Sequence, residues 1–177
     1  VDTHGGTFEA TLWCSKLGQN LRFNCFTDAI DFTGTSILDV GCGIGDFATF
    51  LIDSTIAFRS YRGIDAMVAM VDSAKKKQLK HCEFIVGDVL ANESLLQDTD
   101  WSIFSGTLNA MTQENAMELI KKSFHSSSIG VAFNFLSNQC WRELESEDLS
   151  PASRFNTLDF LHFAFSLTPL VSFTQMY

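Results

Sequence analysis

The sequence has few prolines, few basic residues and no long apolar run. Its 2 prolines and 11 glycines among 177 residues exclude collagen-like and low-complexity chains. No apolar stretch approaches the roughly 20 residues of a membrane span, and no charged start leads into an apolar stretch as in a signal peptide. With 46% hydrophobic residues, the chain has the size and composition of one globular domain.

Positive charge is also scarce. There are 12 Lys and Arg residues against 21 Asp and Glu, which gives a formal net charge of -9. Binding to nucleic acid or to an anionic membrane relies on basic patches, so we expect neither kind of partner. The short lysine run at 75–77 is interpreted as the basic end of a helix, where cations are favoured.

The cysteines form no pattern that indicates a metal site or a disulfide framework. They are odd in number and never spaced as Cys-x-x-Cys. A cytoplasmic protein is therefore expected, and no metal cofactor. The sequence starts at Val1 rather than at a methionine, so whether further residues precede Val1 is left open. The five positions are Cys14, Cys25, Cys42, Cys82 and Cys140.

Short apolar runs alternate with longer segments of helical periodicity, which is the signature of βαβ units. We expect strands at 36–40, 61–65, 82–86, 101–104, 130–136 and 170–175. Helices are expected at about 46–52, 67–74, 112–125 and 156–165. Thr112 and Asn156 are of the residue types preferred before a first helical turn.

A glycine-rich turn follows the first expected strand, in the segment Leu-Asp-Val-Gly-Cys-Gly-Ile-Gly from position 38. Glycines at Gly41 and Gly43 let the backbone approach a ligand, and the next helix offers free N–H groups. This pattern alone suits any nucleotide. Asp39 narrows the range of ligands, because a carboxylate beside the turn disfavours a pyrophosphate and favours a ligand with an ammonium and a sulfonium.

Acidic residues end the first three expected strands, at Asp39, Asp65 and Asp88. In open α/β sheets the ligand lies beyond the carboxyl ends of the strands, near the point where the strand order reverses. Asp65 follows the glycines at about the spacing, roughly 20 residues, at which an acidic residue receives ribose hydroxyls. Three such residues at successive strand ends indicate one binding edge.

With these motifs, the chain resembles the class I S-adenosylmethionine-dependent methyltransferases from about Trp13 onward. The resemblance implies an α/β fold with a Rossmann-like, doubly wound, mostly parallel sheet and helices on both faces. It implies a single domain, with residues 1–33 as an N-terminal helical cover and 34–177 as the core. S-adenosylmethionine would be the cofactor and S-adenosylhomocysteine the product.

The resemblance also implies roles for particular residues. Asp39, Gly41 and Gly43 would surround the methionine part of the cofactor, with Cys42 as the small residue of the tight turn, and Asp65 with neighbouring Ala66 would receive the ribose. Asp88 would bind the adenine amino group and the Val89 N–H the ring. The backbone of Ser105 would face the methionine amine, and Arg22, in a Gln-x-x-Arg-Phe segment, would pair with the cofactor carboxylate unless it forms a structural ion pair.

The sequence departs from the family pattern in two places. Enzymes of this class close the sheet with a sixth and a seventh strand, yet this sequence stops at Tyr177 after its sixth. A truncated chain, a lost tail and a strand supplied by a partner all remain open. The fourth strand is followed by Ser-Gly-Thr-Leu-Asn rather than by an Asn-Pro-Pro-Tyr motif, and no Pro-Cys nucleophile is present, so DNA base methylation is disfavoured.

Methyl transfer from a sulfonium needs alignment more than acid–base chemistry, and no catalytic base is identified. His4, His81, His125 and His162 are scattered, and only His4 is kept in view. Asn109 and Trp141 are candidates to face the substrate. We expect a methyltransferase acting on a small molecule or a protein side chain. The alternatives are a methyltransferase-like binding module acting through its Phe-rich C-terminal face and a nicotinamide-dependent oxidoreductase.

Overall fold

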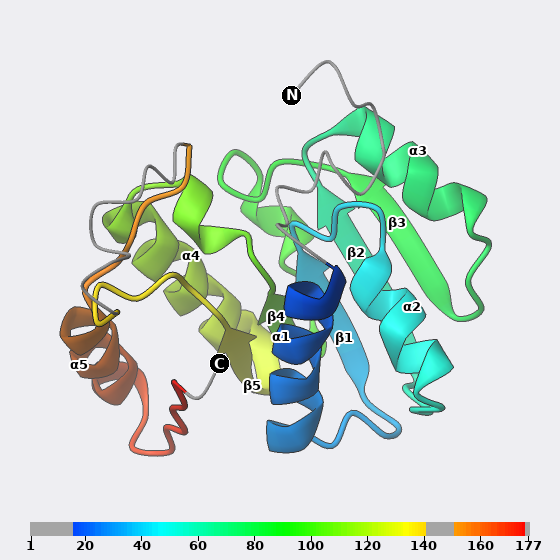
Figure 1. Ribbon diagram of the computed structural model, residues 1–177. Helices are drawn as coiled ribbons and strands as arrows, with labels where there is room; N and C mark the ends of the chain where they lie inside the picture. The colour runs from blue at the N-terminus through cyan, green and yellow to red at the C-terminus, as the bar shows by residue number, and fades with distance from the viewer. Residues whose placement is uncertain (1–15, 141–150, 176–177) are drawn as a thin grey trace.

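One parallel sheet organises the protein, of which the computed structural model describes residues 16–140 and 151–175 (Figure 1). Its strands are β1 (Ser36–Val40), β2 (Ser60–Asp65), β3 (Cys82–Val86), β4 (Thr99–Phe104) and β5 (Ser127–Phe133). They lie in the order β3-β2-β1-β4-β5, and every neighbouring pair is parallel. The chain moves from β1 out to β3 and then returns to the other side of β1. The strand order therefore reverses between β1 and β4, as in doubly wound folds.

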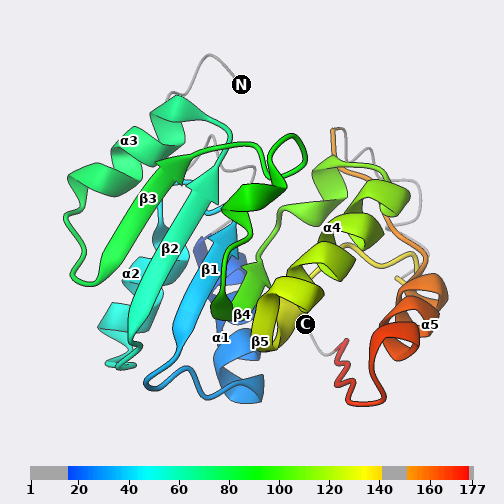
Figure 2. The same cartoon turned by 180° about the vertical axis from the view of Figure 1, so that it is seen from behind.

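Helices cover both faces of the sheet, as Figure 2 shows from behind. The helices are α1 (Lys16–Ala29), α2 (Asp46–Asp53), α3 (Val68–Lys76), α4 (Gln113–Ser126) and α5 (Thr157–Leu167). α1, α2 and α3 pack on one face, and α4 and α5 on the other. Within the expected N-terminal cover, the structure describes α1, while residues 1–15 lie outside the described part. No helix in the described ranges is long and apolar enough to span a bilayer.

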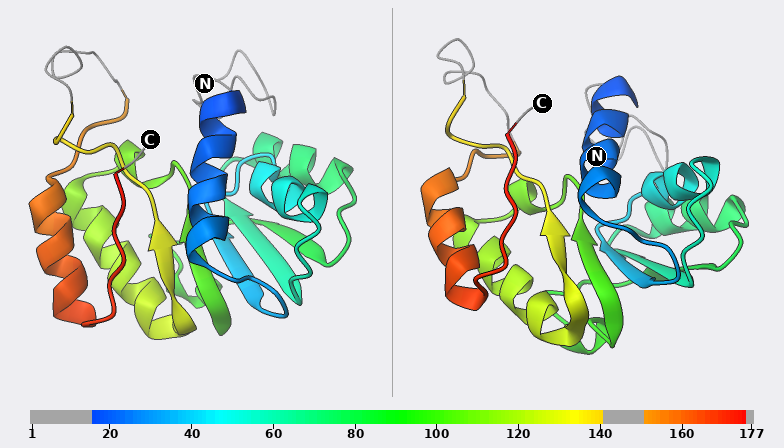
Figure 3. Two further views of the ribbon diagram at one scale, coloured as in Figure 1. Left: turned by 60° about the horizontal axis from the view of Figure 1, so that its bottom comes forward. Right: turned by 90° about the horizontal axis from the view of Figure 1, so that it is seen from below.

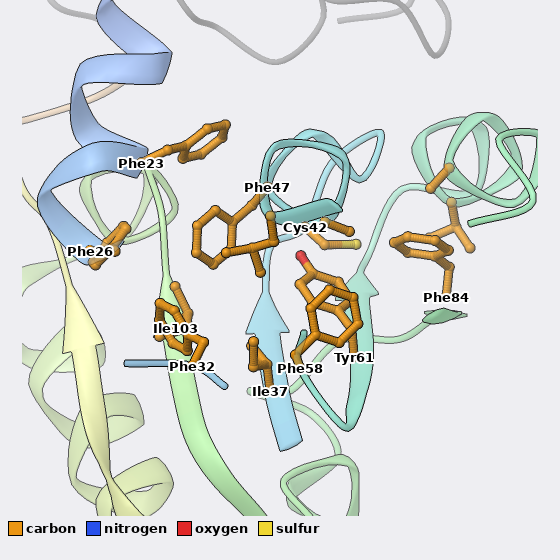
Figure 4. Close-up of a cluster of buried hydrophobic side chains, with 14 residues drawn as sticks. Phe23, Phe26, Phe32, Ile37, Cys42, Phe47, Phe58, Tyr61, Phe84 and Ile103 are labelled. Atoms are coloured by element: carbon orange, nitrogen blue, oxygen red, sulfur yellow. The ribbon is translucent and has the colours of Figure 1, made fainter. Parts of the chain in front are cut away.

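Two hydrophobic cores, one on each face, hold the layers together. In β1, Ile37 faces the core under α1, α2 and α3, whereas Leu38 and Val40 face the core under α4 and α5. The first core is rich in aromatic rings and includes Tyr61 and Phe47 (Figure 4). Because both faces are covered, the strand is apolar on both sides, which explains the nearly continuous apolar runs in the sequence.

Both expected helix caps are confirmed. The Thr112 hydroxyl accepts a hydrogen bond from the N–H of Asn115 at 3.2 Å, at the start of α4. The Asn156 side chain accepts from the N–H groups of Leu158 and Asp159, at 3.0 and 3.3 Å, at the start of α5. Lysines occupy the last turn of α3, as expected for its C-terminus.

β5 was expected at 130–136 but begins and ends three residues earlier. Ser127 and Ser128 belong to the strand although they are polar, because their hydroxyls have partners there. Ser127 Oγ lies 2.8 Å from Ser102 Oγ, and Ser128 Oγ donates to the Asp100 carboxylate at 2.7 Å. Periodicity could not find this start, since cross-strand hydrogen bonding rather than apolar burial stabilises it.

The sixth strand expected at 170–175 is wrong: this segment has no regular structure. In both views of Figure 3 it follows α5 and passes between that helix and β5 without joining the sheet. Leu170 and Phe173 are 87% and 48% exposed. β5 pairs with β4 alone among the described residues. An apolar run forms a strand only where its N–H and C=O groups pair with a neighbouring strand, and this segment pairs with none of the described strands.

Candidate functional site

The chain turns sharply at the carboxyl end of β1, at the two glycines predicted to approach a ligand. Gly41 and Gly43 have φ angles of 76° and 54°, in the left-handed region that favours glycine. The N–H groups of Gly41 and Cys42 both donate to the carbonyl of Ile64, at 2.7 and 3.0 Å. The turn is therefore fastened to the end of β2.

The loop after β4 lies directly against this turn. The Thr107 hydroxyl donates to the carbonyl of Val40 at 2.8 Å. A Cβ atom on Gly41 would lie 2.3 Å from Thr107 Oγ1, too close for any side chain. The turn after β1 and the loop after β4 thus meet where the strand order reverses, which is where open α/β sheets bind ligands. No sequence pattern indicated Thr107 as a site residue.

Asp65, at the end of β2, is joined to the glycine turn. One of its carboxylate oxygens accepts a hydrogen bond from the N–H of Gly43 and the other from the N–H of Met67, both at 2.9 Å. Two of the predicted site residues, Gly43 and Asp65, are therefore in direct contact. Ala66, the next residue along the chain, is exposed at the same edge.

Asp88 lies beyond the end of β3 and is exposed. One of its carboxylate oxygens accepts from the N–H of Leu90 at 2.9 Å, while the side chain of Val89 is buried. Two exposed apolar side chains also follow these strands: Met67 after β2 is 37% exposed and Leu90 after β3 is 46% exposed. The edge near β2 and β3 therefore combines carboxylates with apolar surface, as a ring with polar substituents requires.

Asp39 is almost completely buried, and the hydroxyl of the equally buried Tyr61 donates to its Oδ2. The other oxygen, Oδ1, has no hydrogen-bond partner among the described residues. Burial raises the pKa of Asp39 to about 7, and the Tyr61 hydrogen bond only partly opposes this. Burial also raises the pKa of Tyr61, as does the nearby Asp39 carboxylate. No sequence pattern indicated this pair.

The Cys42 thiol is buried in the turn and is not a nucleophile. Burial raises the pKa of this thiol far above its usual range, and the carboxylates of Asp39 and Asp65 raise it further. A thiol that stays protonated is unreactive, so Cys42 acts as a small apolar residue. It packs into the core between β2 and α2 that Figure 4 shows.

Arg22 lies on α1, half-buried, one turn after Gln19. The Gln19 side chain is buried and its amide donates to the carboxylate of Asp46 at 3.3 Å. Asp46, the first residue of α2, also accepts from Lys77 Nζ at 2.8 Å. Phe23, next to Arg22, packs in the core. The predicted Gln-x-x-Arg-Phe segment thus connects α1 to the helix that follows the glycine turn.

Of the two predicted substrate residues, Asn109 is structural in this chain. It is buried, its Nδ2 donates to the carbonyl of Ser153 at 2.6 Å, and its Oδ1 accepts from the N–H of Leu136 at 2.8 Å. Both polar ends of the amide are used to tie two backbone segments together. Trp141, the other candidate, lies outside the described residues.

Ser105 and Asn134 end the neighbouring strands β4 and β5. Both carry a side-chain atom that is shielded from solvent and has no hydrogen-bond partner in the described part of the chain: Ser105 Oγ and Asn134 Nδ2. Ser105 was predicted from the family resemblance. Asn134 was missed, because an asparagine in an apolar run carries no recognisable motif.

No histidine of the described ranges lies at this edge. His81 lines a cavity of about 330 Å³ at the amino ends of the strands, together with Ser36 and Arg62. His125 is in the last turn of α4, and His162 is exposed on α5. His4 lies outside the described residues. The cavity is at the opposite end of the sheet from the glycine turn, so it is separate from the candidate site.

Residues 16–140 and 151–175 contain no group of His, Cys, Asp or Glu side chains that could hold a metal ion. The carboxylates of Asp39, Asp65 and Asp88 are instead spread over three strand ends.

Solved structures with the same fold are methyltransferases. Magnesium protoporphyrin IX methyltransferase from Synechocystis has a TM-score of 0.68 at 15% identity, over 85% of this chain and 71% of that one. A TehB-like methyltransferase from Corynebacterium glutamicum has a TM-score of 0.57 at 22% identity, over 84% of this chain and 71% of that one. Human N-acetylserotonin methyltransferase has a TM-score of 0.67 at 15% identity, over 89% of this chain but 49% of its own length. These likenesses show the fold.

Comparison with curated protein sequences gives no significant match. The family model described as "Methyltransferase domain" matches residues 31–148, which is most of the chain and includes the glycine turn and all three acidic strand ends. The chain therefore belongs to the methyltransferase domain family.

Proposed function

We propose that the chain transfers a methyl group from S-adenosylmethionine to a small-molecule acceptor, with a protein side chain as the second acceptor class. One observation carries this proposal: the Asp65 carboxylate is bonded to the Gly43 N–H at the edge where the strand order reverses. This contact brings a ribose-binding carboxylate and a glycine turn together. The solved neighbours that are described with bound S-adenosylmethionine or S-adenosylhomocysteine support it.

The residues at this edge fit such a cofactor. Asp65 already accepts two backbone N–H groups, but a carboxylate has about four acceptor positions, so it can also receive ribose hydroxyls. Asp88 is exposed and can accept from the adenine amino group, and the exposed apolar side chains of Met67 and Leu90 follow β2 and β3. The unpartnered Asp39 Oδ1 and the nearby acidic residues favour a ligand that carries positive charge.

The sulfonium of the bound donor supplies an already activated methyl group. The protein then has to hold donor and acceptor in line and to exclude water from them. Asp65 would hold the ribose of the donor, and the glycine turn and the adjoining loop at Ser105 and Thr107 would border its methionine end. No group of this chain has to act as an acid or base on the sulfur.

One observation supports the alternative that the chain is a binding module. Phe165, Leu170 and Phe173 are 58%, 87% and 48% exposed, and all lie in the C-terminal part of the chain. Such an apolar surface is a feature of interaction sites. A stable complex in size-exclusion chromatography, together with cofactor binding but no methyl transfer, would favour this alternative.

A thermal-shift titration with S-adenosylmethionine, S-adenosylhomocysteine and NAD, run in parallel, tests the proposal. A ligand at about 100 times its Kd adds about 2.7 kcal/mol, which raises the Tm of a chain of this size by roughly 5 to 11 °C. We expect this shift with the two adenosyl ligands and not with NAD. A shift with NAD alone would favour the oxidoreductase alternative, and no shift with any ligand would contradict the proposal.

Asp65→Asn and Asp88→Ala are each expected to lower the affinity for S-adenosylhomocysteine about tenfold, because each removes charge-assisted hydrogen bonds to the ligand. The amide introduced by Asp65→Asn keeps one acceptor oxygen, for the N–H of Met67, and loses the bond from the N–H of Gly43. Isothermal titration calorimetry measures the affinities. Asp98→Asn, at the exposed opposite edge of the sheet, is the control and should bind as the wild type does. Unchanged affinity in both site variants would refute the site.

A further inference from the structure

Two shielded polar atoms stand without partners at the carboxyl ends of β4 and β5, the hydroxyl oxygen of Ser105 and the amide nitrogen of Asn134; neither has a hydrogen-bond partner among the described residues. A polar group that is removed from water and left unpaired destabilises the folded chain, so such groups are rare and call for an explanation. Here two of them occur on adjacent strands at the edge that binds ligands in this fold.

The two residues are held next to each other by the backbone. The Asn134 N–H donates to the carbonyl of Phe104 at 3.1 Å, which extends the pairing of β4 and β5 by one residue. The Asn134 side chain then accepts from the N–H of Gly106, through Oδ1 at 2.8 Å. Asn134 therefore spans the residue that lies between Phe104 and Gly106, which is Ser105.

The bond from Gly106 also fixes which end of the amide is free. Because Oδ1 accepts the N–H, the free end is the NH₂ group, which donates hydrogen bonds and cannot accept them. The Ser105 hydroxyl can donate beside it. A carboxylate or hydroxyl oxygen keeps a lone pair for these donors while another attacks the methyl group, whereas a neutral amine nitrogen has only the one that must attack.

This pair lies one strand away from the glycine turn. Thr107, two residues after Ser105, contacts Gly41 and donates to the carbonyl of Val40. The pair is therefore beside the part of the site where the donor's methionine end is proposed to lie. Asn109 was the predicted substrate residue in this loop, but its amide is already committed to the backbone.

We propose that Ser105 and Asn134 bind the oxygen atom of the methyl acceptor, so that this chain methylates a carboxylate or a hydroxyl group. The inference rests on the proposed function and adds the class of acceptor.

The step is balanced without a base of this chain when the acceptor is a carboxylate. A lone pair of the acceptor oxygen forms the new O–C bond, the C–S bond breaks, and the sulfur keeps the bonding pair as a neutral thioether. A carboxylate has no proton to lose, and a hydroxyl group would release its proton to water. This agrees with the absence of histidine from the edge in the described ranges.

The carboxylate of the cofactor also has oxygen atoms that can accept hydrogen bonds from Ser105 and Asn134. The test separates this ligand from the methyl acceptor. The variant is Asn134→Asp, which keeps the acceptor for the Gly106 N–H but replaces the free NH₂ donor by an oxygen. Asn138→Asp is the matched control: Asn138 is exposed in the same loop, accepts from the N–H of Thr157 through Oδ1, and gains the same charge. Ser105→Ala removes the second donor.

Each protein is first titrated with S-adenosylhomocysteine by calorimetry. Each is then incubated with S-adenosylmethionine labelled with deuterium on the methyl group and a small-molecule metabolite extract, and labelled products are sorted by mass spectrometry into O-, N-, S- and C-methyl compounds. We expect O-methyl products from the wild type. Their rate of formation should fall at least about tenfold in Asn134→Asp and in Ser105→Ala, with unchanged S-adenosylhomocysteine affinity and an unaffected control.

The outcomes are distinct. If S-adenosylhomocysteine does not bind the wild type, the proposed function itself fails. If it binds and no O-methyl product forms, or N-, S- or C-methyl products dominate, the acceptor class is wrong. If Asn134→Asp weakens S-adenosylhomocysteine binding and Asn138→Asp does not, the pair binds the cofactor carboxylate, which overturns the assignment to the acceptor.

Discussion

Gly41→Ala is expected to lower the affinity for S-adenosylhomocysteine at least about 100-fold, the largest effect on binding of any substitution proposed for this chain. Two causes act together. The φ angle of 76° is unfavourable for alanine, and the new Cβ would lie 2.3 Å from Thr107 Oγ1. The Thr107 side chain cannot simply rotate away without losing its bond to Val40. Relieving the clash displaces either the glycine turn or the loop after β4, and both border the site.

Gly34→Ala is the matched control for backbone strain. Gly34 has a φ angle of 71°, similar to that of Gly41, but no atom lies within 4 Å of the Cβ position. This variant should lose about 1 kcal/mol of stability and keep the wild-type affinity. Calorimetric titration and urea unfolding of both variants measure the two effects. Equal losses of affinity would show that the clash with Thr107 does not matter.

Asp39→Asn is expected to stabilise the protein at high pH and to leave its stability unchanged at low pH. The pKa of Asp39 is about 7 in the folded chain, raised by burial from its ordinary value of 3.8. Between these two values the folded state binds more protons than the unfolded state, so stability falls as the pH rises from about 4 to about 7. Above that range the buried charge costs up to about 4 kcal/mol, which asparagine avoids while still accepting from Tyr61.

Urea unfolding of the wild type and Asp39→Asn at about pH 5 and about pH 8 measures this difference. The gap between the two proteins should widen by at least about 2 kcal/mol toward the higher pH. Asp72→Asn, an exposed position on α3, removes the same formal charge and should show no such widening. A gap that stays constant between the two pH values would mean that Asp39 is ionised throughout.

The sequence was sufficient for features that depend on neighbouring residues. The ends of β1 and β3 and the starts of α4 and α5 follow from short apolar runs, a glycine or a capping side chain, all of which act locally. The sequence also predicted that the acidic residues after the strands lie along one edge, since parallel strands bring their carboxyl ends to the same edge. The contact of Asp65 with Gly43 agrees with that alignment.

Features that depend on distant partners could not be predicted. The segment at 170–175 has the composition of a strand, but it pairs with no strand among the described residues. Asn109 and Asn134 are the same residue type after adjacent strands, and only their hydrogen-bond partners distinguish a buried tie from a free donor. The sequence therefore could not distinguish the roles of these two asparagines, because those roles depend on the backbone groups around each side chain.

The amino-acid sequence by itself determined the βαβ alternation, the glycine turn and the carboxylates that follow the strands, because these are set by residue type and spacing along the chain. The tertiary structure alone decided that Tyr61 donates a hydrogen bond to Asp39, that Thr107 lies against Gly41, and that the Asn134 side chain accepts the N–H of Gly106. Each of these contacts joins residues of different elements. Their distances depend on how the strands are ordered and paired, which local sequence does not encode.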